Sequence, residues 1–135
     1  MEIRSKTGKS INNLSILNTY APHMQYDQED ISNYWEEVRK TLDGVHKNLI
    51  KIWRTDNNGK IAQTEQNESI GKWTIGTKTD IGNGGNFASI LAEQQLTCVH
   101  TFFIPPKNDI RELETCHIYD ANLKRQIDFI SINRK

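Results

Sequence analysis

The stretch LSILNTYAPHMQYDQEDISNYWEEVRKTLDGVHKNLIKIW, residues 14–53, contains the clearest evidence for the fold. Its opening segment, 14–20, is rich in apolar side chains and predicts a strand. That strand should end at Ala21-Pro22, because proline has no backbone N–H to donate to a sheet. Residues 48–53 predict a second strand, followed at once by a turn-forming cluster at 56–59.

A helix is predicted between these strands. Its apolar residues recur at offsets of 0, 3, 4, 7 and 11, which place them on one helical face: Ile31, Tyr34, Trp35, Val38 and Leu42. Asp27 or Asp30 can cap the start of this helix, and Gly44 follows its end.

The rest of the chain predicts a long loop, a second helix and three more strands. The loop covers 59–82, with a short ordered stretch at 70–73, and the second helix covers 83–95. The strands are expected at 97–103, 115–119 and 126–132, the last two as a hairpin turning at 120–122. Residues 1–12 predict an edge or a tail. The alternation of strands and helices followed by a run of strands fits a mixed α/β sandwich.

The bulk composition limits the possible functions only weakly. The 135 residues suit one domain or part of a larger one, and 36% of them are hydrophobic. The 17 basic and 17 acidic residues cancel, so the chain has no overall attraction for nucleic acid, although a local basic groove is compatible with this balance. Cys98 and Cys116 match no zinc spacing, and most of the histidines are interpreted as surface or strand-face residues. With no signal peptide and no membrane-length apolar run, we expect an intracellular protein, nuclear or cytoplasmic.

Two acidic segments lie at the ends of strand-like runs, where carboxylates are both held and exposed. Asp56 can bind a hard cation or orient a water molecule, and Asn58 can donate to a phosphoryl oxygen. The alternative is that DNNG at 56–59 only forms a turn. Asp128 should point opposite to its apolar neighbours 127 and 129, either into a polar site or towards solvent from an edge hairpin.

Two aromatic residues have similar open alternatives. Tyr20, at the end of the first strand, either contacts a phosphate or covers the edge of the core. Trp73 either pins the long loop to the body of the domain or stacks on a base. The glycine-rich segment 82–85 follows no strand directly and therefore indicates a loop and helix cap, not a dinucleotide site.

Four segments, in this order, resemble motifs of the endonuclease/exonuclease/phosphatase superfamily. They are LNTYAP at 17–22, YWEEV at 34–38, TDNNGK at 55–60 and RQIDFI at 125–130. The third is similar to the family's Gly-Asp-Phe-Asn-Ala-Lys loop and the fourth to its Gln-Ile-Asp-Tyr-Ile strand. Within the superfamily, the chain looks most like retrotransposon-type endonuclease domains and the craniofacial development protein 2-like proteins.

The resemblance implies an α+β fold: a fragment of a four-layer α/β sandwich, with two mixed β-sheets flanked by helices. It also implies magnesium-dependent hydrolysis of phosphodiester bonds in DNA. Asp56 would then activate water, Asn58 would position the phosphate, Tyr20 would contact the scissile phosphate and Asp128 would support the centre.

The chain departs from the family in ways that bear on activity. Residues 1–135 would form a single partial domain, without the family's first strands, which carry its metal-binding Glu, and without its final Ser-Asp-His segment. Thr55 replaces a loop glycine and Asn57 a phenylalanine. We therefore expect weak nuclease activity or none. The alternatives are a noncatalytic remnant on the same scaffold, or an ordinary α/β interaction domain in which DNNG is only a turn. The nuclease interpretation requires positions 20, 56, 58 and 128 to line one cleft.

Overall fold

The computed structural model describes residues 3–4, 10–11, 14–62, 67–75, 78–79, 81–104, 113–118 and 123–134. The main strands are β3 (Leu14–Tyr20), β4 (Ile50–Asp56), β5 (Leu96–Cys98) and β8 (Asp128–Asn133), and the helices are α1 (Gln28–Asp43) and α2 (Asn83–Glu93). The shorter strands are β1 (Ile3–Arg4), β2 (Ser10–Ile11), β6 (Cys116–Ile118) and β7 (Leu123–Arg125). Within these stretches, no helix has both the length and the apolar character needed to span a membrane.

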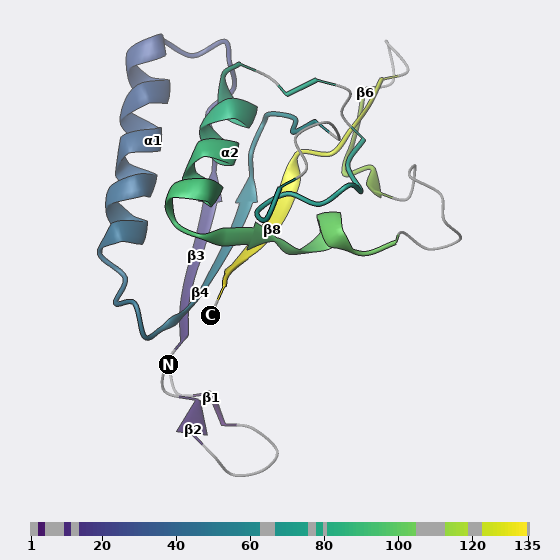
Figure 1. The fold of residues 1–135 in the computed structure, drawn as a ribbon. Coiled ribbons are helices and arrows are strands. Elements are labelled where there is room, and N and C mark those ends of the chain that lie inside the picture. The colour runs from purple at the N-terminus through teal and green to yellow at the C-terminus, as the bar shows by residue number, and fades with distance from the viewer. Residues whose placement is uncertain are drawn as a thin grey trace.

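The centre of the fold is a mixed four-stranded sheet in the order β3-β4-β8-β5 (Figure 1). β3 and β4 are parallel and are connected through α1, whereas β8 runs antiparallel to both β4 and β5. Two-stranded antiparallel pairs, β1-β2 and β6-β7, complete the described strands. The predicted α+β class is therefore confirmed at this level: one mixed sheet with two helices.

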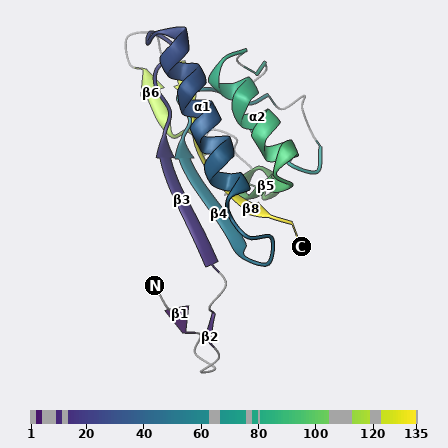
Figure 2. The ribbon, with the colours of Figure 1, turned by 90° about the vertical axis from the view of Figure 1, so that its left-hand side faces the viewer.

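Both helices pack on the same side of this sheet (Figure 2). The predicted face of α1 is confirmed, because four of its residues are buried: Ile31, Trp35, Val38 and Leu42. From α2 the buried apolar residues are those expected, namely Phe87, Ile90 and Leu91. They meet Trp53 of β4 and Phe129 of β8 in one core, with Phe87 stacked on Phe129 at 4.9 Å between ring centroids.

The opposite face of the sheet is exposed and partly apolar. Because side chains alternate along a strand, the residues between the buried ones point away from the helices. Ile16, Ile52 and Ile132 form one row across three strands. Ile16 is 56% exposed and Ile130, on the same face, is 49% exposed. Among the described residues, the helices cover only the other face of the sheet.

β4 is longer than predicted, and β5 is shorter. β4 continues to Asp56, so the acidic residue ends a strand that pairs on both sides. The strand predicted at 97–103 ends at Cys98, and a 3-10 helix, η2 (Val99–Phe102), replaces the remainder. The reason is local, because the hydroxyl of Thr101 donates to the Cys98 carbonyl at 2.7 Å and closes a tight turn.

The same threonine holds the ordered part of the long loop. Thr101 Oγ1 accepts from the Gly71 amide at 2.8 Å, and its carbonyl accepts from the Trp73 amide at 2.9 Å. Trp73 therefore belongs to a segment that backbone hydrogen bonds hold against the domain. The short ordered stretch predicted at 70–73 is confirmed.

The last strands pair differently from the predicted hairpin. β6 pairs with β7, whereas β8 lies between β4 and β5. The chain bends between the two sheets because the amides of Ile127 and Asp128 donate to the Thr115 hydroxyl, at 2.9 and 3.2 Å, and not to a neighbouring strand. The turn predicted at 120–122 lies outside the described residues.

Candidate functional site

Tyr20, Asp56 and Asp128 form a single cross-strand row at one end of the sheet. Tyr20 of β3 is the register partner of Asp56 of β4, and Asp56 is the register partner of Asp128 of β8. Thr55 and Phe129, their neighbours in β4 and β8, are buried beneath the helices. The row therefore lies on the exposed face, at the carboxyl ends of the two parallel strands.

The two carboxylates form an especially close type of pair. The Asp56 carbonyl accepts from the Ala21 amide of the β3 side at 2.8 Å, and the Asp128 amide donates to Thr115 Oγ1. Asp56 and Asp128 therefore share no backbone hydrogen bond. In such pairs the opposite Cα atoms lie about 4.5 Å apart and the side chains are closest. This places both carboxylates well within the separation of about 12 Å beyond which one metal or phosphate could not serve both.

Asn58 joins the row through the turn that follows β4. Its amide N–H donates to Asp56 Oδ1 at 3.1 Å, and its side-chain Nδ2 donates to the Ala21 carbonyl at 2.7 Å. Its φ of 43° is in the left-handed region that Asn tolerates well. The DNNG segment thus forms a turn, and that turn also holds Asn58 beside the carboxylates. One hydrogen of the Asn58 side-chain amide is used by Ala21, which leaves the second for a ligand.

The remaining two predicted site residues have different surroundings. Tyr20 is 60% exposed, and its hydroxyl lies 3.3 Å from His23 Nε2. Asp128 is half-buried in an internal strand, and its backbone amide is held by the Thr115 hydroxyl. The alternative that placed Asp128 on a hairpin with residues 115–119 is wrong, because β8 pairs with β4 at this position and β6 pairs with β7. The sequence pattern does not indicate that the Thr115 hydroxyl holds the Asp128 amide.

Two buried asparagine side chains hold in place the loops that follow β3 and β4. Asn83 Oδ1 accepts from Trp35 Nε1 at 3.0 Å, and Asn83 Nδ2 donates to the Pro22 carbonyl at 2.7 Å. Asn57, which is fully buried, donates through Nδ2 to the Asn83 carbonyl at 3.4 Å. The loops after β3 and after β4 are thus both tied to the first residue of α2. The sequence pattern indicates Asn83 only as part of a helix cap.

The four predicted site residues do not line one hollow. Asn58 lines a hollow of about 880 Å³, whereas Tyr20 and Asp128 line two others. The single cleft that the nuclease interpretation requires is therefore not found among the described residues.

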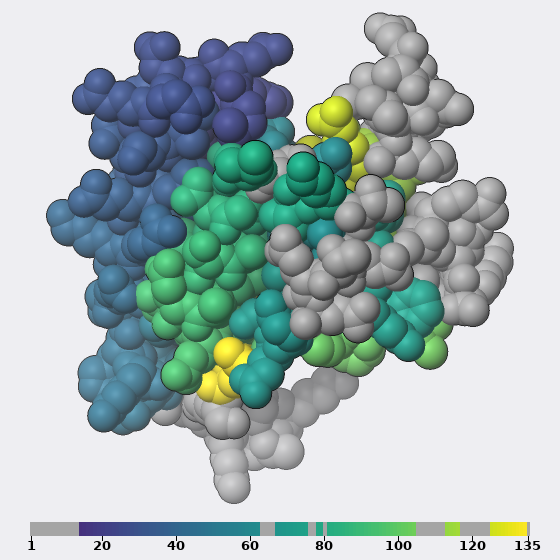
Figure 3. Space-filling view, turned by 45° about the horizontal axis from the view of Figure 1, so that its top comes forward, coloured from purple at the N-terminus to yellow at the C-terminus, as the bar shows by residue number. Residues whose placement is uncertain are grey.

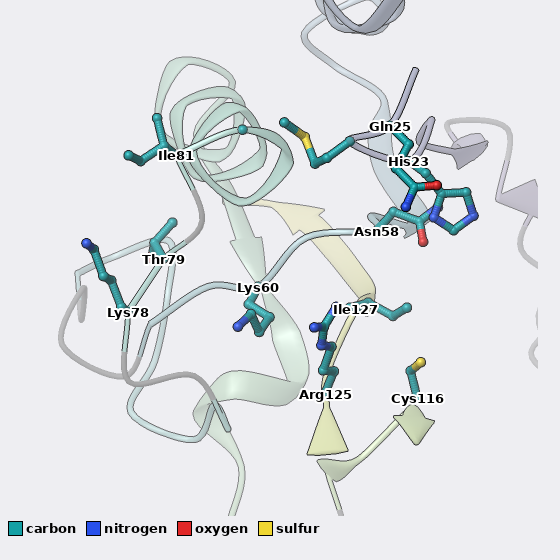
Figure 4. Close-up of a pocket in the computed structure, with 12 residues that line it drawn as sticks. His23, Gln25, Asn58, Lys60, Lys78, Thr79, Ile81, Cys116, Arg125 and Ile127 are labelled. Atoms are coloured by element: carbon teal, nitrogen blue, oxygen red, sulfur yellow. The ribbon is translucent and has the colours of Figure 1, made fainter. Parts of the chain in front are cut away.

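The hollow of about 880 Å³ adjoins the row through Asn58, which contacts Asp56. Figure 3 shows it between the segment that follows β3, in purple, and the segment around β7 and β8, in yellow. Three cationic residues, Lys60, Lys78 and Arg125, line the hollow together with Asn58 (Figure 4). No carboxylate is found among its described lining residues. The hollow is therefore a local basic surface of the kind that is compatible with the balanced net charge.

His100 lies near the other side of Asp128. Its ring stacks on Phe129 at 5.6 Å, and burial lowers the pKa of this histidine below 6.5. Both residues line a second hollow of about 380 Å³, which Asp128 and Arg54 also line. The His100 ring is half-buried and packs against Phe129 as part of the support for the core.

The described residues offer few ligands for magnesium at this site. Asp56 and Asp128 supply carboxylate oxygens from one face, and magnesium commonly binds through one or two carboxylates while it keeps several water molecules. Over the described ranges there is no cluster of three or more His, Cys, Asp or Glu side chains that could hold a metal ion. A cation at this pair would depend on water and substrate for its other ligands.

No protein-family model matches the sequence, and a search of curated proteins finds no match.

Proposed function

We propose that this chain is an endonuclease/exonuclease/phosphatase-like domain that hydrolyses phosphodiester bonds in DNA with magnesium, at a low rate. The observation that carries the proposal is the direct opposition of Asp56 and Asp128 on the exposed face of the sheet. Like charges directly opposite each other in a sheet are destabilising, so a fold keeps them only where they do something else. Binding a cation is the simplest use of such a pair.

Each residue of the row has a chemical role in the proposed reaction. Asp56 accepts a proton from a water molecule, which attacks phosphorus as the bond to the leaving oxygen breaks on the opposite side. The second amide hydrogen of Asn58 and the Tyr20 hydroxyl hold the phosphate oxygens in line. Asp128 would share the cation with Asp56. When bound, magnesium neutralises charge on the phosphoryl oxygens.

The low rate follows from the number of ligands. The row supplies two carboxylates, and a cation with so few protein ligands is bound weakly. A noncatalytic interaction module on the same scaffold is the alternative function, and the same observation favours it.

We also propose that the sheet is one half of a four-layer sandwich with two β-sheets. The support is the exposed apolar face, on which Ile16, Ile52, Ile130 and Ile132 lie. A contiguous apolar face of this kind normally packs against another layer. A second sheet packed there would also enclose the acidic row at its edge.

The test is nicking of supercoiled plasmid in the presence of magnesium or manganese. We expect slow nicking that is lost in Asp56→Asn and Asp128→Asn and retained in Glu36→Gln, an exposed change on α1. If nicking is absent or does not depend on Asp56, the enzymatic proposal is wrong. Thermal unfolding then separates the alternatives, because a noncatalytic module without a metal site gains no stability from added magnesium.

A further inference from the structure

We infer that the hollow beside the carboxylate row binds one unpaired strand of nucleic acid, which leads the scissile phosphate to Asp56 and Asp128. This inference rests on the proposed function and specifies the form of its substrate. It assigns the backbone phosphates to Lys60, Lys78 and Arg125, and the bases to the apolar side chains of the lining, Met24, Ile81 and Ile127.

The distribution of charge points to a polymeric anion. The chain as a whole has 17 basic and 17 acidic residues, yet the charged residues described around this hollow are all cationic. They come from three separate parts of the chain: Lys60 follows the β4 turn, Lys78 precedes α2 and Arg125 ends β7. Figure 4 shows Lys60 and Arg125 within the hollow and Lys78 farther along it. Cations spread along a hollow suit successive phosphates better than a single one.

The apolar side chains of the lining argue for exposed bases. Ile81 is 93% exposed and Met24 is 45% exposed, and both line the hollow with Ile127. A compact polyphosphate would neutralise the cations but leave these apolar side chains in water. In a duplex the faces of the bases are covered by their neighbours and cannot reach them. An unpaired strand offers both phosphates and apolar base faces along its length, which matches a lining in which cations and apolar side chains alternate (Figure 4).

Asn58 connects the hollow to the row. It lines the hollow, and its amide N–H also donates to Asp56 Oδ1 at 3.1 Å. A strand that lies along Lys60 and Arg125 therefore passes Asn58 before it reaches the carboxylates. The phosphate at that point is the one that the proposed reaction would cleave.

The experiment measures binding without cleavage, by fluorescence anisotropy in EDTA over a series of salt concentrations. The probes are a labelled eight-residue oligothymidylate and an eight-base-pair duplex, with inositol hexakisphosphate as a competing compact anion. We expect the single strand to bind more tightly than the duplex and to resist the competitor. The double variant Lys78→Gln/Arg125→Gln should reduce the slope of log K against log salt by about 1.4, from about 0.7 for each phosphate that the protein no longer neutralises.

The control is Lys40→Gln/Lys47→Gln, which removes the same charge from exposed positions near the opposite end of the sheet. Equal or tighter binding of the duplex, effective competition by the compact anion, or an unchanged slope in Lys78→Gln/Arg125→Gln overturns the inference. If that double variant does not fold, Lys78→Gln alone, at an exposed loop position, should reduce the slope by about 0.7. Asp56→Asn should keep binding while it loses nicking, so failure of catalysis and failure of this inference are distinguishable.

Discussion

Asn83, the first residue of α2, accepts a hydrogen bond from the indole Nε1 of Trp35 in α1 at 3.0 Å, deep in the core. The same side chain donates to the Pro22 carbonyl at 2.7 Å. Since Pro22 follows Tyr20 closely in the chain, this one amide links the packing of the helices to the position of the acidic row. The core and the site are therefore expected to weaken together when it is removed.

Replacing Asn83 by Ala should destabilise the fold strongly. The change leaves the Trp35 N–H and the Pro22 carbonyl without their partner, at a cost of about 2–4 kcal/mol in the free energy of unfolding. Urea denaturation measures this loss. Ser89→Ala, at an exposed position of the same helix, should change stability by less than about 0.5 kcal/mol. Equal effects of the two changes would contradict the role of Asn83.

Neutralising either carboxylate of the row should stabilise the protein. Asp56→Asn and Asp128→Asn each remove the repulsion between opposite like charges, and each should raise the free energy of unfolding by about 0.2–1 kcal/mol. Because one repulsion is removed only once, the double variant should gain less than the sum of the two. Thermal or urea unfolding without divalent metal checks this, and a loss of stability in both single variants would refute it.

Adding a side chain at Gly59 should destabilise the fold. A Cβ at this position would lie 2.5 Å from the backbone nitrogen of Gly84 and 2.7 Å from Asn83 Cβ. Gly59→Ala should therefore cost about 1–3 kcal/mol through forced backbone shifts. Gly44→Ala is the matched control, because its nearest contacts are at 3.5 Å and its φ is −68°. That change should leave stability equal or raise it by about 0.4–1 kcal/mol.

Acidification should destabilise the fold partly through His100. Burial lowers the pKa of His100 in the folded state below its ordinary value of 6.5. The unfolded chain therefore binds a proton more readily than the folded protein, and stability falls as the pH drops below about 6.5. Urea unfolding at about pH 8 and about pH 5.5, on either side of that value, should show a smaller loss in His100→Gln than in the wild type. His23→Gln, at an exposed position, should keep the wild-type loss.

Local patterns in the sequence were sufficient for the main elements. The strand predicted at 14–20 is β3, and the periodic run from Ile31 to Leu42 is the buried face of α1. Such patterns succeed because the alternation of a strand and the turn of a helix depend on neighbouring residues. They failed at 97–103, where the Thr101 hydroxyl closes a 3-10 turn, and at the last hairpin, where Thr115 takes the amides of Ile127 and Asp128 out of the ladder.

The candidate site was likewise predictable from the sequence only in part. The sequence by itself determined which side chains could do chemistry, namely Tyr20, Asp56, Asn58 and Asp128, because residue type and position at a strand end are local properties. Only the tertiary structure decided that three of them share one row and that cations from distant segments surround the adjoining hollow. Strand register depends on which faces can be buried against the helices, and that is a property of the whole packed core.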